Sequence, residues 1–230
     1  MFERFKQRSH ELERLDTGDY TPAEYARWER EMPWIHGFMG EGRALRETLV
    51  RDVRFRGLTQ VSILDVGAGS GGILKLLART LPDVKLLPIA VEMNEIALAT
   101  IRNESKGTGI VPLKADGLRL PFADKSVDYV ICTLFLHHLM DSDAMKLISE
   151  MDRVARRGFY AVDLNRHPVG YYAYRLFSPL FLQKFTQEDG ALSILRSFTP
   201  SELLAIAREG GVENPRVTHS RANRLVLSRG

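Results

Sequence analysis

Short apolar runs alternate with amphipathic stretches from about Val61 onward, which is typical of a parallel sheet covered by helices. The apolar runs predict strands at residues 61–66, 85–91, 110–115, 127–133 and 159–163, and a terminal hairpin at 216–219 and 224–227. The amphipathic stretches predict helices at residues 72–80, 94–103, 142–155 and 199–208. We therefore expect an α/β fold with a mostly parallel sheet that ends in an antiparallel hairpin.

Helical signals also mark two segments outside this alternation. Thr21, Pro22 and Glu24 form a capping box with proline at the first helical position, and residues 41–52 predict another helix. Residues 1–56 are thus expected to form an N-terminal helical cap, and residues 57–230 the main domain. The stretch 165–197 is too long for an ordinary connection, so we expect an inserted helical lid.

Two prolines fall inside predicted strands. Pro88 lies in the second strand and Pro112 in the third. Proline lacks the N–H group that a central ladder needs, so each should mark a strand end, a bulge or a sheet edge.

Charge and composition narrow the class of partner. The chain has 32 basic and 29 acidic residues among 230, a net charge of +3, with no basic stripe of the kind that binds nucleic acid. No apolar run reaches the roughly 17–25 residues of a spanning helix, so stable membrane insertion is not expected. The N-terminus lacks a signal-peptide core, and the lone cysteine, Cys132, fits a reducing compartment. We expect a cytoplasmic protein; its oligomeric state is left open.

The segment ILDVGAGSGG, residues 63–72, joins the first predicted strand to a helix. Gly67, Gly69 and Gly72 satisfy the G-x-G-x-x-G pattern of dinucleotide sites, in which bare backbone lets a ligand approach. Asp65 stands two residues before the first of these glycines, where its carboxylate would repel a pyrophosphate. It would attract the amino group and sulfonium of S-adenosylmethionine instead.

Two more acidic residues end successive strands. Glu92 ends the second strand, where an acidic side chain typically binds ribose hydroxyls, and Asp116 ends the third, placed to accept from an adenine amine. Glu92 would suit NAD and S-adenosylmethionine equally. Three acids in register around one glycine loop favour a cofactor site over three independent helix caps.

Four stretches carry a resemblance to a known family: DVGAGSG, VEMN, KADGLRLPFADKSVDYV and FLHHL. Together they resemble class I S-adenosylmethionine-dependent methyltransferases, the branch that includes ubiquinone- and menaquinone-biosynthesis-type and related bacterial small-molecule enzymes. The resemblance implies a Rossmann-like, seven-stranded fold, S-adenosylmethionine as cofactor and S-adenosylhomocysteine as product. The positions it implies for cofactor binding are Asp65, Gly67, Ala68, Gly69, Gly71, Glu92, Met93, Asp116, Gly117, Leu134 and His137.

Methyl transfer from a sulfonium is an in-line displacement that needs no metal, so none is expected. Alignment of the reactants can supply up to roughly 7–11 kcal/mol of the barrier, against about 3–5 kcal/mol for a general base. The candidate bases are His137 and His138, after the fourth strand. One of them could equally line the cofactor pocket while the other packs behind it.

The acceptor is expected to be small and lipophilic or aromatic, with O-methylation of a phenol, quinol or polyketide favoured. Residues 169–185 are rich in aromatic side chains and poor in charge, and residues 32–40 could close the pocket from the other side. A pair of core-facing helices would give the same pattern. The expected acceptor-pocket residues are Trp34, His36, Asp163, Arg166, Tyr171 and Tyr174. A non-catalytic cofactor-binding partner protein and an NAD(P)-dependent oxidoreductase are the alternatives.

Overall fold

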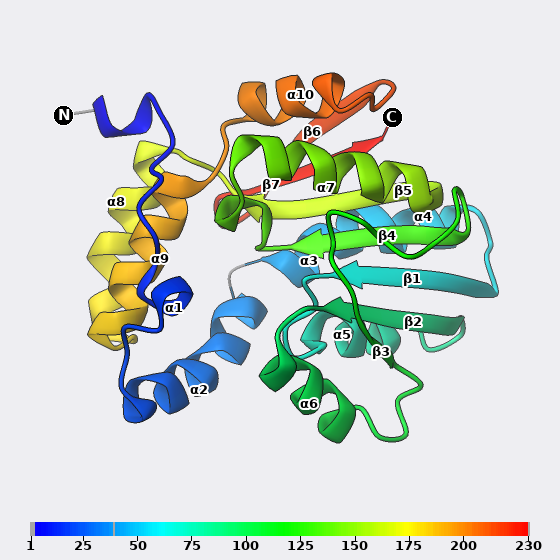
Figure 1. Ribbon diagram of the computed structural model, residues 1–230, viewed down its shortest axis with the longest axis horizontal. Coiled ribbons are helices and arrows are strands. Elements are labelled where there is room, and N and C mark those ends of the chain that lie inside the picture. Colours follow the sequence, from blue (N-terminus) through cyan, green and yellow to red (C-terminus); the bar gives the residue numbers. More distant parts are fainter. Residues whose placement is uncertain (1–2, 39, 230) are drawn as a thin grey trace.

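The computed structural model describes residues 3–38 and 40–229, without the side chains of residues 33, 34, 36–38 and 104. Its centre is a seven-stranded sheet in the order β3-β2-β1-β4-β5-β7-β6 (Figure 1). The strands are β1 (Gln60–Val66), β2 (Lys85–Glu92), β3 (Val111–Lys114), β4 (Val127–Thr133), β5 (Ala155–Leu164), β6 (Pro215–Ser220) and β7 (Arg224–Arg229). The pairs among β1 to β5 are parallel, and β7 runs antiparallel to both of its neighbours, β5 and β6. The expected fold class and terminal hairpin are confirmed.

Helices cover both faces of this sheet because each presents an apolar stripe to it. On one face α7 (Asp141–Val154) and α10 (Pro200–Glu209) contribute to a core that includes Leu147 and Leu203. On the other lie α3 (Glu41–Leu45), the π-helical turn η2 (Arg46–Val50), α4 (Arg51–Phe55), α5 (Gly72–Thr80) and α6 (Glu95–Glu104). Residues 41–55 therefore pack into the core of the sheet rather than into a separate cap.

The proline prediction is confirmed for one of the two residues. Pro112 is in the edge strand β3. Pro88 lies inside β2 and pairs with Ile63 of β1, but β3 pairs with β2 only from Ile89 onward. The β5 prediction was too short at its beginning. The strand starts at Ala155, directly after α7, because Ala155 pairs with Val127 and the chain enters the sheet without a loop.

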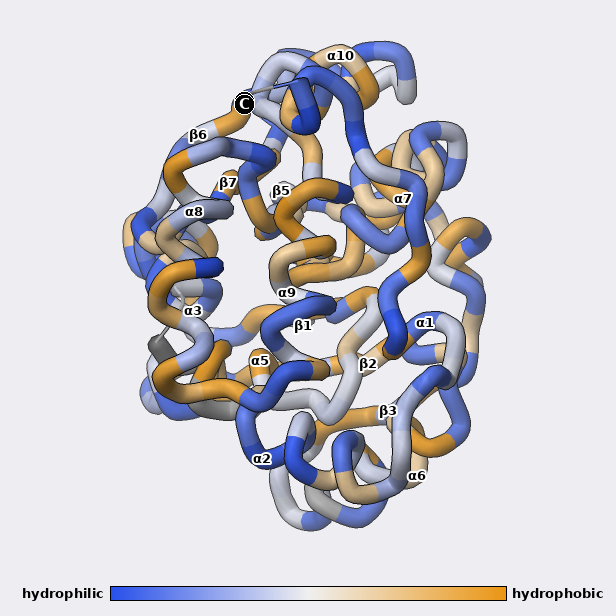
Figure 2. The backbone as a smooth tube through the Cα atoms, turned by 90° about the vertical axis from the view of Figure 1, so that its left-hand side faces the viewer, coloured by the Kyte–Doolittle hydropathy of each residue, from blue (hydrophilic) through white to orange (hydrophobic). Residues whose placement is uncertain are grey.

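The remaining helices lie beyond the carboxyl ends of the parallel strands (Figure 1). They are η1 (Glu3–Phe5), α1 (Arg14–Thr17), α2 (Pro22–Phe38), η3 (Leu136–His138), α8 (Pro168–Phe177), η4 (Ser178–Leu180) and α9 (Lys184–Arg196). Asp189 of α9 accepts hydrogen bonds from the backbone N–H groups of Arg14 and Leu15, at 3.0 and 2.9 Å. In Figure 2, which looks onto this side, hydrophobic positions of α9 lie near the centre of the view. The N-terminal segment and the 165–197 insertion thus form one layer over the sheet edge.

Membrane insertion can be judged from helix length and hydropathy. Within the described part of the chain, no helix is both long and apolar enough to cross a bilayer.

Candidate functional site

The glycine loop after β1 is shaped by positive φ angles that glycine alone adopts at little cost. Gly67, Gly69 and Gly71 have φ of 71°, 53° and 73°, and Gly71 is the N-cap of α5. A Cβ atom on Gly67 would lie 2.9 Å from the ring of Phe135. At Gly67 the Phe135 ring therefore packs directly onto the backbone, whereas a Cβ atom on Gly69 would meet nothing within 4 Å.

Asp65, near the end of β1, lies beneath this loop, and its carboxyl group is fully buried. Its side chain is 1% exposed, and its Oδ1 has no hydrogen-bond partner among the described residues. Burial, and to a smaller extent the nearby charge of Glu92, raises the pKa of Asp65 to about 8. A buried acid with an unsatisfied oxygen is costly to the fold, and a cationic ligand would offset that cost.

Glu92 links the glycine loop to the next helix. Its Oε2 accepts the N–H of Gly69 at 3.1 Å, and its Oε1 accepts those of Met93 and Asn94 at 2.8 and 2.9 Å. Asn94 in turn caps α6, so the carboxylate is held at the mouth of the loop. The side chain is only partly buried and lines the cavity described below, where it can accept from a diol.

The remaining positions expected at the adenine lie along the same edge but do not line the cavity. Met93 is 59% exposed after β2, and Asp116 is exposed with its Oδ1 accepting the N–H of Leu118 at 2.8 Å. A Cβ atom on Gly117 would lie 2.7 Å from Val66, so this loop packs closely against the end of β1. Met93, Asp116 and Gly117 thus lie at the same sheet edge as Glu92 but outside the cavity lining.

A cavity of about 380 Å³ opens between the glycine loop and the helical layer. Gly67, Ala68, Gly69 and Glu92 line one end, and His137 and His138 lie in the wall. The other end is largely apolar, lined by side chains that include Leu15, Trp28, Met32, Ile35, Leu164, Tyr174 and Ile194. Leu134, also in the wall, has a positive φ of 51°, a strained conformation of the kind that clusters at functional sites.

His137 is fixed by a buried carboxylate. Its Nδ1 lies 2.6 Å from Oδ1 of Asp163, which also accepts the backbone N–H of Leu164 at 2.7 Å. Burial acts to raise the pKa of Asp163, but His137 and the backbone donors outweigh it and hold the pKa below its usual value. The ionised carboxylate keeps a proton on Nδ1, so Nε2 presents its lone pair.

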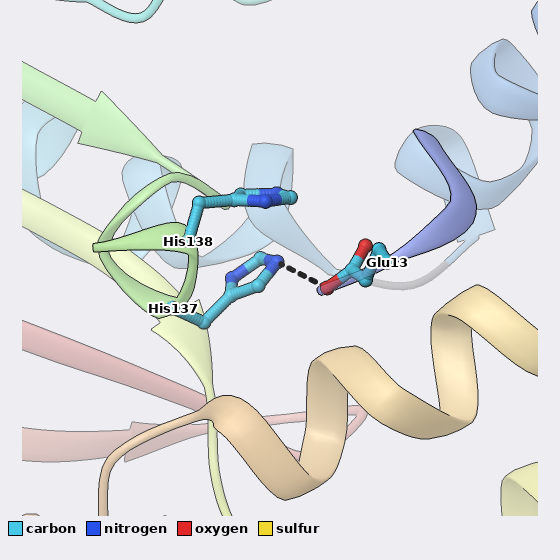
Figure 3. Close-up of side chains that lie close together, drawn as sticks. All are labelled: Glu13, His137 and His138. Carbon is cyan, nitrogen blue, oxygen red and sulfur yellow. Dashed lines mark ion pairs between the residues drawn. The ribbon is translucent and has the colours of Figure 1, made fainter. Parts of the chain in front are cut away.

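A third residue, Glu13 before α1, completes this part of the wall and was missed by the sequence reasoning. Figure 3 shows the His137 ring directed at Glu13, whose Oε1 lies 3.9 Å from Nε2. Glu13 is 3% exposed and accepts the hydroxyl of Ser193 at 2.9 Å. Burial raises the pKa of Glu13 to about 7, even though His138, Ser193 and Arg196 act to lower it.

Arg196 and Asp16 hold the histidine turn against the N-terminal segment. Asp16 Oδ1 lies 3.0 Å from Nδ1 of His138. Arg196 donates to the carbonyl oxygens of His137 and His138, at 3.2 and 3.0 Å, and also to Asp16. No local motif marks these contacts, because they join residues more than 50 positions apart.

The residues predicted for the acceptor pocket lie in different parts of the structure. Tyr174 lines the cavity, and its hydroxyl donates to the carbonyl of Thr186 at 2.7 Å. Arg166 lies outside the lining, where it donates to the carbonyls of Phe5 and Ser197, and Tyr171 packs on Phe5. Asp163 acts on the cavity only through His137. The side chains of Trp34 and His36 lie outside the described residues.

A known protein family matches the part of the chain that carries the cofactor end of this site. The family model described as "Methyltransferase domain" matches residues 64–162, from β1 through β5. Residues 64–162 form a methyltransferase domain. Its glycine loop, buried Asp65 and Glu92 fit S-adenosylmethionine as the cofactor, since the ligand carries positive charge and a ribose diol. The match over residues 64–162, together with the fold, supports the resemblance to class I S-adenosylmethionine-dependent methyltransferases that the sequence predicted.

Curated relatives match part of the chain. A demethylmenaquinone methyltransferase of Roseiflexus sp. (strain RS-1) is 32% identical over 163 residues, which are 64% of this chain and 66% of the relative. A malonyl-[acyl-carrier protein] O-methyltransferase of Methylococcus capsulatus is 32% identical over 117 residues, 50% of this chain and 41% of the relative. The chain thus spans less than two thirds of the length of these relatives.

Solved structures share the fold. An Aquifex aeolicus SAM-dependent methyltransferase has a TM-score of 0.57 at 18% identity, covering 85% of this chain and 96% of its own. A structure described as "PigF with SAH" has a TM-score of 0.61 at 19% identity, covering 94% and 64%. These likenesses at low identity concern the fold alone.

Proposed function

We propose that this chain transfers a methyl group from S-adenosylmethionine to a hydroxyl of a small, lipophilic or aromatic acceptor. One observation carries the proposal. A single cavity joins the glycine loop and Glu92 at one end to an apolar chamber at the other, with the Asp163-held His137 between them. The cofactor and an acceptor bound in this cavity would meet beside His137.

The chain's own part in the reaction is mainly alignment. When bound, S-adenosylmethionine supplies an electrophilic methyl group, and the protein must hold the acceptor oxygen in line with it. Asp65 and the loop at Gly67–Gly69 would hold the methionine end, and Glu92 the ribose hydroxyls. The methionine-end contacts are favourable because Oδ1 of Asp65 is buried and has no hydrogen-bond partner among the described residues, so a positive charge nearby would be attracted to it.

His137 is the better placed of the two candidate bases. Asp163 keeps the proton on Nδ1, so Nε2 can accept a proton from an acceptor hydroxyl in the cavity. The His138 ring is tied to Asp16 at the edge of the same wall and would border the acceptor. A base in this position adds to the alignment effect but does not replace it.

The size and lining of the cavity favour a small molecule over a macromolecule. The whole cavity, with its cofactor end included, has a volume of about 380 Å³, near the lower end of the range for small-molecule sites, and α1, α2 and α9 cover the sheet edge above it. The apolar lining suits a ring or an alkyl chain. The named activities of the relatives include a quinone-type acceptor, which makes quinols the first class to try.

The proposal is tested by methyl transfer from S-[methyl-³H]adenosylmethionine to a panel of acceptors. We expect labelled product with alkylated phenols or quinols and none with the corresponding methyl ethers, a short peptide or an RNA oligonucleotide. Transfer only to the peptide or the RNA would overturn the acceptor class. Binding of S-adenosylmethionine without transfer to any acceptor would favour a non-catalytic partner protein.

A further inference from the structure

The side chains of Glu13, His137 and His138 surround a gap in the cavity wall (Figure 3). They come from two segments more than 120 residues apart, and one ligand atom from each lies within 4.8 Å of the other two. Glu13 and His137 are buried, and His138 is partly buried. Two imidazoles and one carboxylate are a donor set that binds divalent transition-metal ions.

Both imidazole rings are oriented by a carboxylate on the far side. Asp163 lies 2.6 Å from Nδ1 of His137, and Asp16 lies 3.0 Å from Nδ1 of His138. With Nδ1 engaged in each ring, Nε2 is the nitrogen left to coordinate. A carboxylate behind a histidine is the usual outer support of a metal ligand, because it fixes the tautomer and the ring angle.

The distance between His137 and Glu13 bears on whether the two side chains share a proton. Nε2 of His137 and Oε1 of Glu13 are 3.9 Å apart. A shared proton requires about 2.7–3.2 Å between the heavy atoms. A tetrahedral ion bound at about 2.0–2.2 Å to each atom holds the two atoms about 3.3–3.6 Å apart. The observed separation exceeds a hydrogen bond, and a shift of a few tenths of an ångström would bring the two atoms to the spacing of metal ligands.

The charges that face the gap also favour a cation. Three carboxylates surround the two histidines: Glu13, Asp16 and Asp163. The cation that approaches Glu13 is Arg196, at 3.6 Å from Oε1, and it is shared with Asp16 and with two backbone carbonyls. Among the described residues, Glu13 Oε1 therefore has a hydroxyl donor, Ser193, and Arg196 lies beyond hydrogen-bond distance at 3.6 Å.

We propose that Glu13, His137 and His138 form a binding site for a divalent transition-metal ion of the zinc type. Three protein ligands leave one coordination position open, and it faces the cavity that the three residues line. How the ion is used rests on the function proposed above: an acceptor oxygen could take the open position. With the ion bound, the His137 lone pair would be a ligand, and the ion would lower the pKa of the coordinated hydroxyl, whose proton would pass to solvent water.

The test is titration of the chelator-treated full chain with Co²⁺, followed by its visible absorption, and with Zn²⁺ by calorimetry. We expect one ion per chain and cobalt bands of a low-coordinate N/O site. Glu13→Gln and His138→Ala should each weaken binding at least tenfold. Glu11→Gln and His10→Ala, exposed changes on the same segment, are the matched controls and should leave it unchanged.

Several results would overturn the site. One is a parent chain that takes up no stoichiometric ion, and another is a Glu13→Gln variant that binds like Glu11→Gln. Circular dichroism of each variant shows whether a loss reflects unfolding, and His138→Gln provides a smaller change if His138→Ala unfolds. S-adenosylmethionine binding by the parent is measured separately. A chain that binds the cofactor but no metal refutes this site alone, whereas failure to bind the cofactor refutes the proposed function.

Discussion

Replacing Asp65 by Asn should make the ligand-free protein more stable, and increasingly so as the pH rises. The carboxyl is 1% exposed with one unpaired oxygen, and burial raises its pKa from 3.8 to about 8. A group whose pKa is raised by folding contributes full stability below its unfolded pKa. That contribution is lost as the pH climbs towards the folded value. The parent should therefore lose stability between about pH 4 and pH 8, and the Asn variant should not.

The size of the effect follows from the same pKa values. Each pH unit between the unfolded and folded pKa corresponds to about 1.4 kcal/mol, so at pH 7 the parent gives up at most about 4 kcal/mol. Urea unfolding of both proteins at pH 4, 5.5, 7 and 8 measures this difference, and the comparison cancels the other titrating groups. Saturating S-adenosylmethionine should narrow the gap, since a cation stabilises the ionised Asp65. Parallel stability curves from pH 4 to pH 8 would refute the reasoning.

Three further substitutions test other parts of the site. Gly67→Ala should lower the free energy of unfolding by about 1–3 kcal/mol and weaken cofactor binding, since its Cβ would lie 2.9 Å from Phe135. Gly158→Ala, whose Cβ would meet no atom within 4 Å, is the control for the stability and the binding measurements. Gly190→Ala, whose Cβ would meet the Tyr174 hydroxyl at 2.2 Å, should raise the acceptor KM in methyl-transfer assays while calorimetry shows unchanged cofactor affinity. Arg166→Met should lower the free energy of unfolding in urea by about 1–3 kcal/mol, because it leaves the carbonyls of Phe5 and Ser197 without their donor. The affinities for S-adenosylmethionine and for the acceptor should stay unchanged, since Arg166 lies outside the cavity lining.

The sheet could be predicted because its signals are local. Apolar runs of strand length separated by amphipathic stretches report a buried parallel sheet wherever they occur, and strands such as β4 (Val127–Thr133) begin and end where they were predicted. The start of β5 was harder to predict. That strand pairs with β4 from Ala155 onward, but its beginning contains the polar pair Arg156–Arg157. The apolar run that predicts the strand therefore starts only after these two residues.

The cofactor end of the site was also accessible from sequence, because strand-end residues of a parallel sheet meet at one edge. The place of Glu13 in the site could not be predicted from the sequence. It depends on two contacts of the N-terminal segment, one with Asp189 of α9 and one between Asp16 and His138. Such contacts between distant segments leave no periodicity or spacing in the chain. The same argument applies to Arg166, whose partners include the carbonyl of Phe5.

The most direct test of the account is calorimetric titration of the purified chain with S-adenosylmethionine, repeated on Asp65→Ala and Glu92→Ala, with NADH as the competing ligand. We predict one site per chain for S-adenosylmethionine, at least tenfold weaker in each variant, and no heat from NADH. Lys85→Ala, an exposed change at the opposite end of β2, should bind like the parent. Binding of NADH in preference to S-adenosylmethionine, or cofactor affinity indifferent to Asp65 and Glu92, would contradict the account.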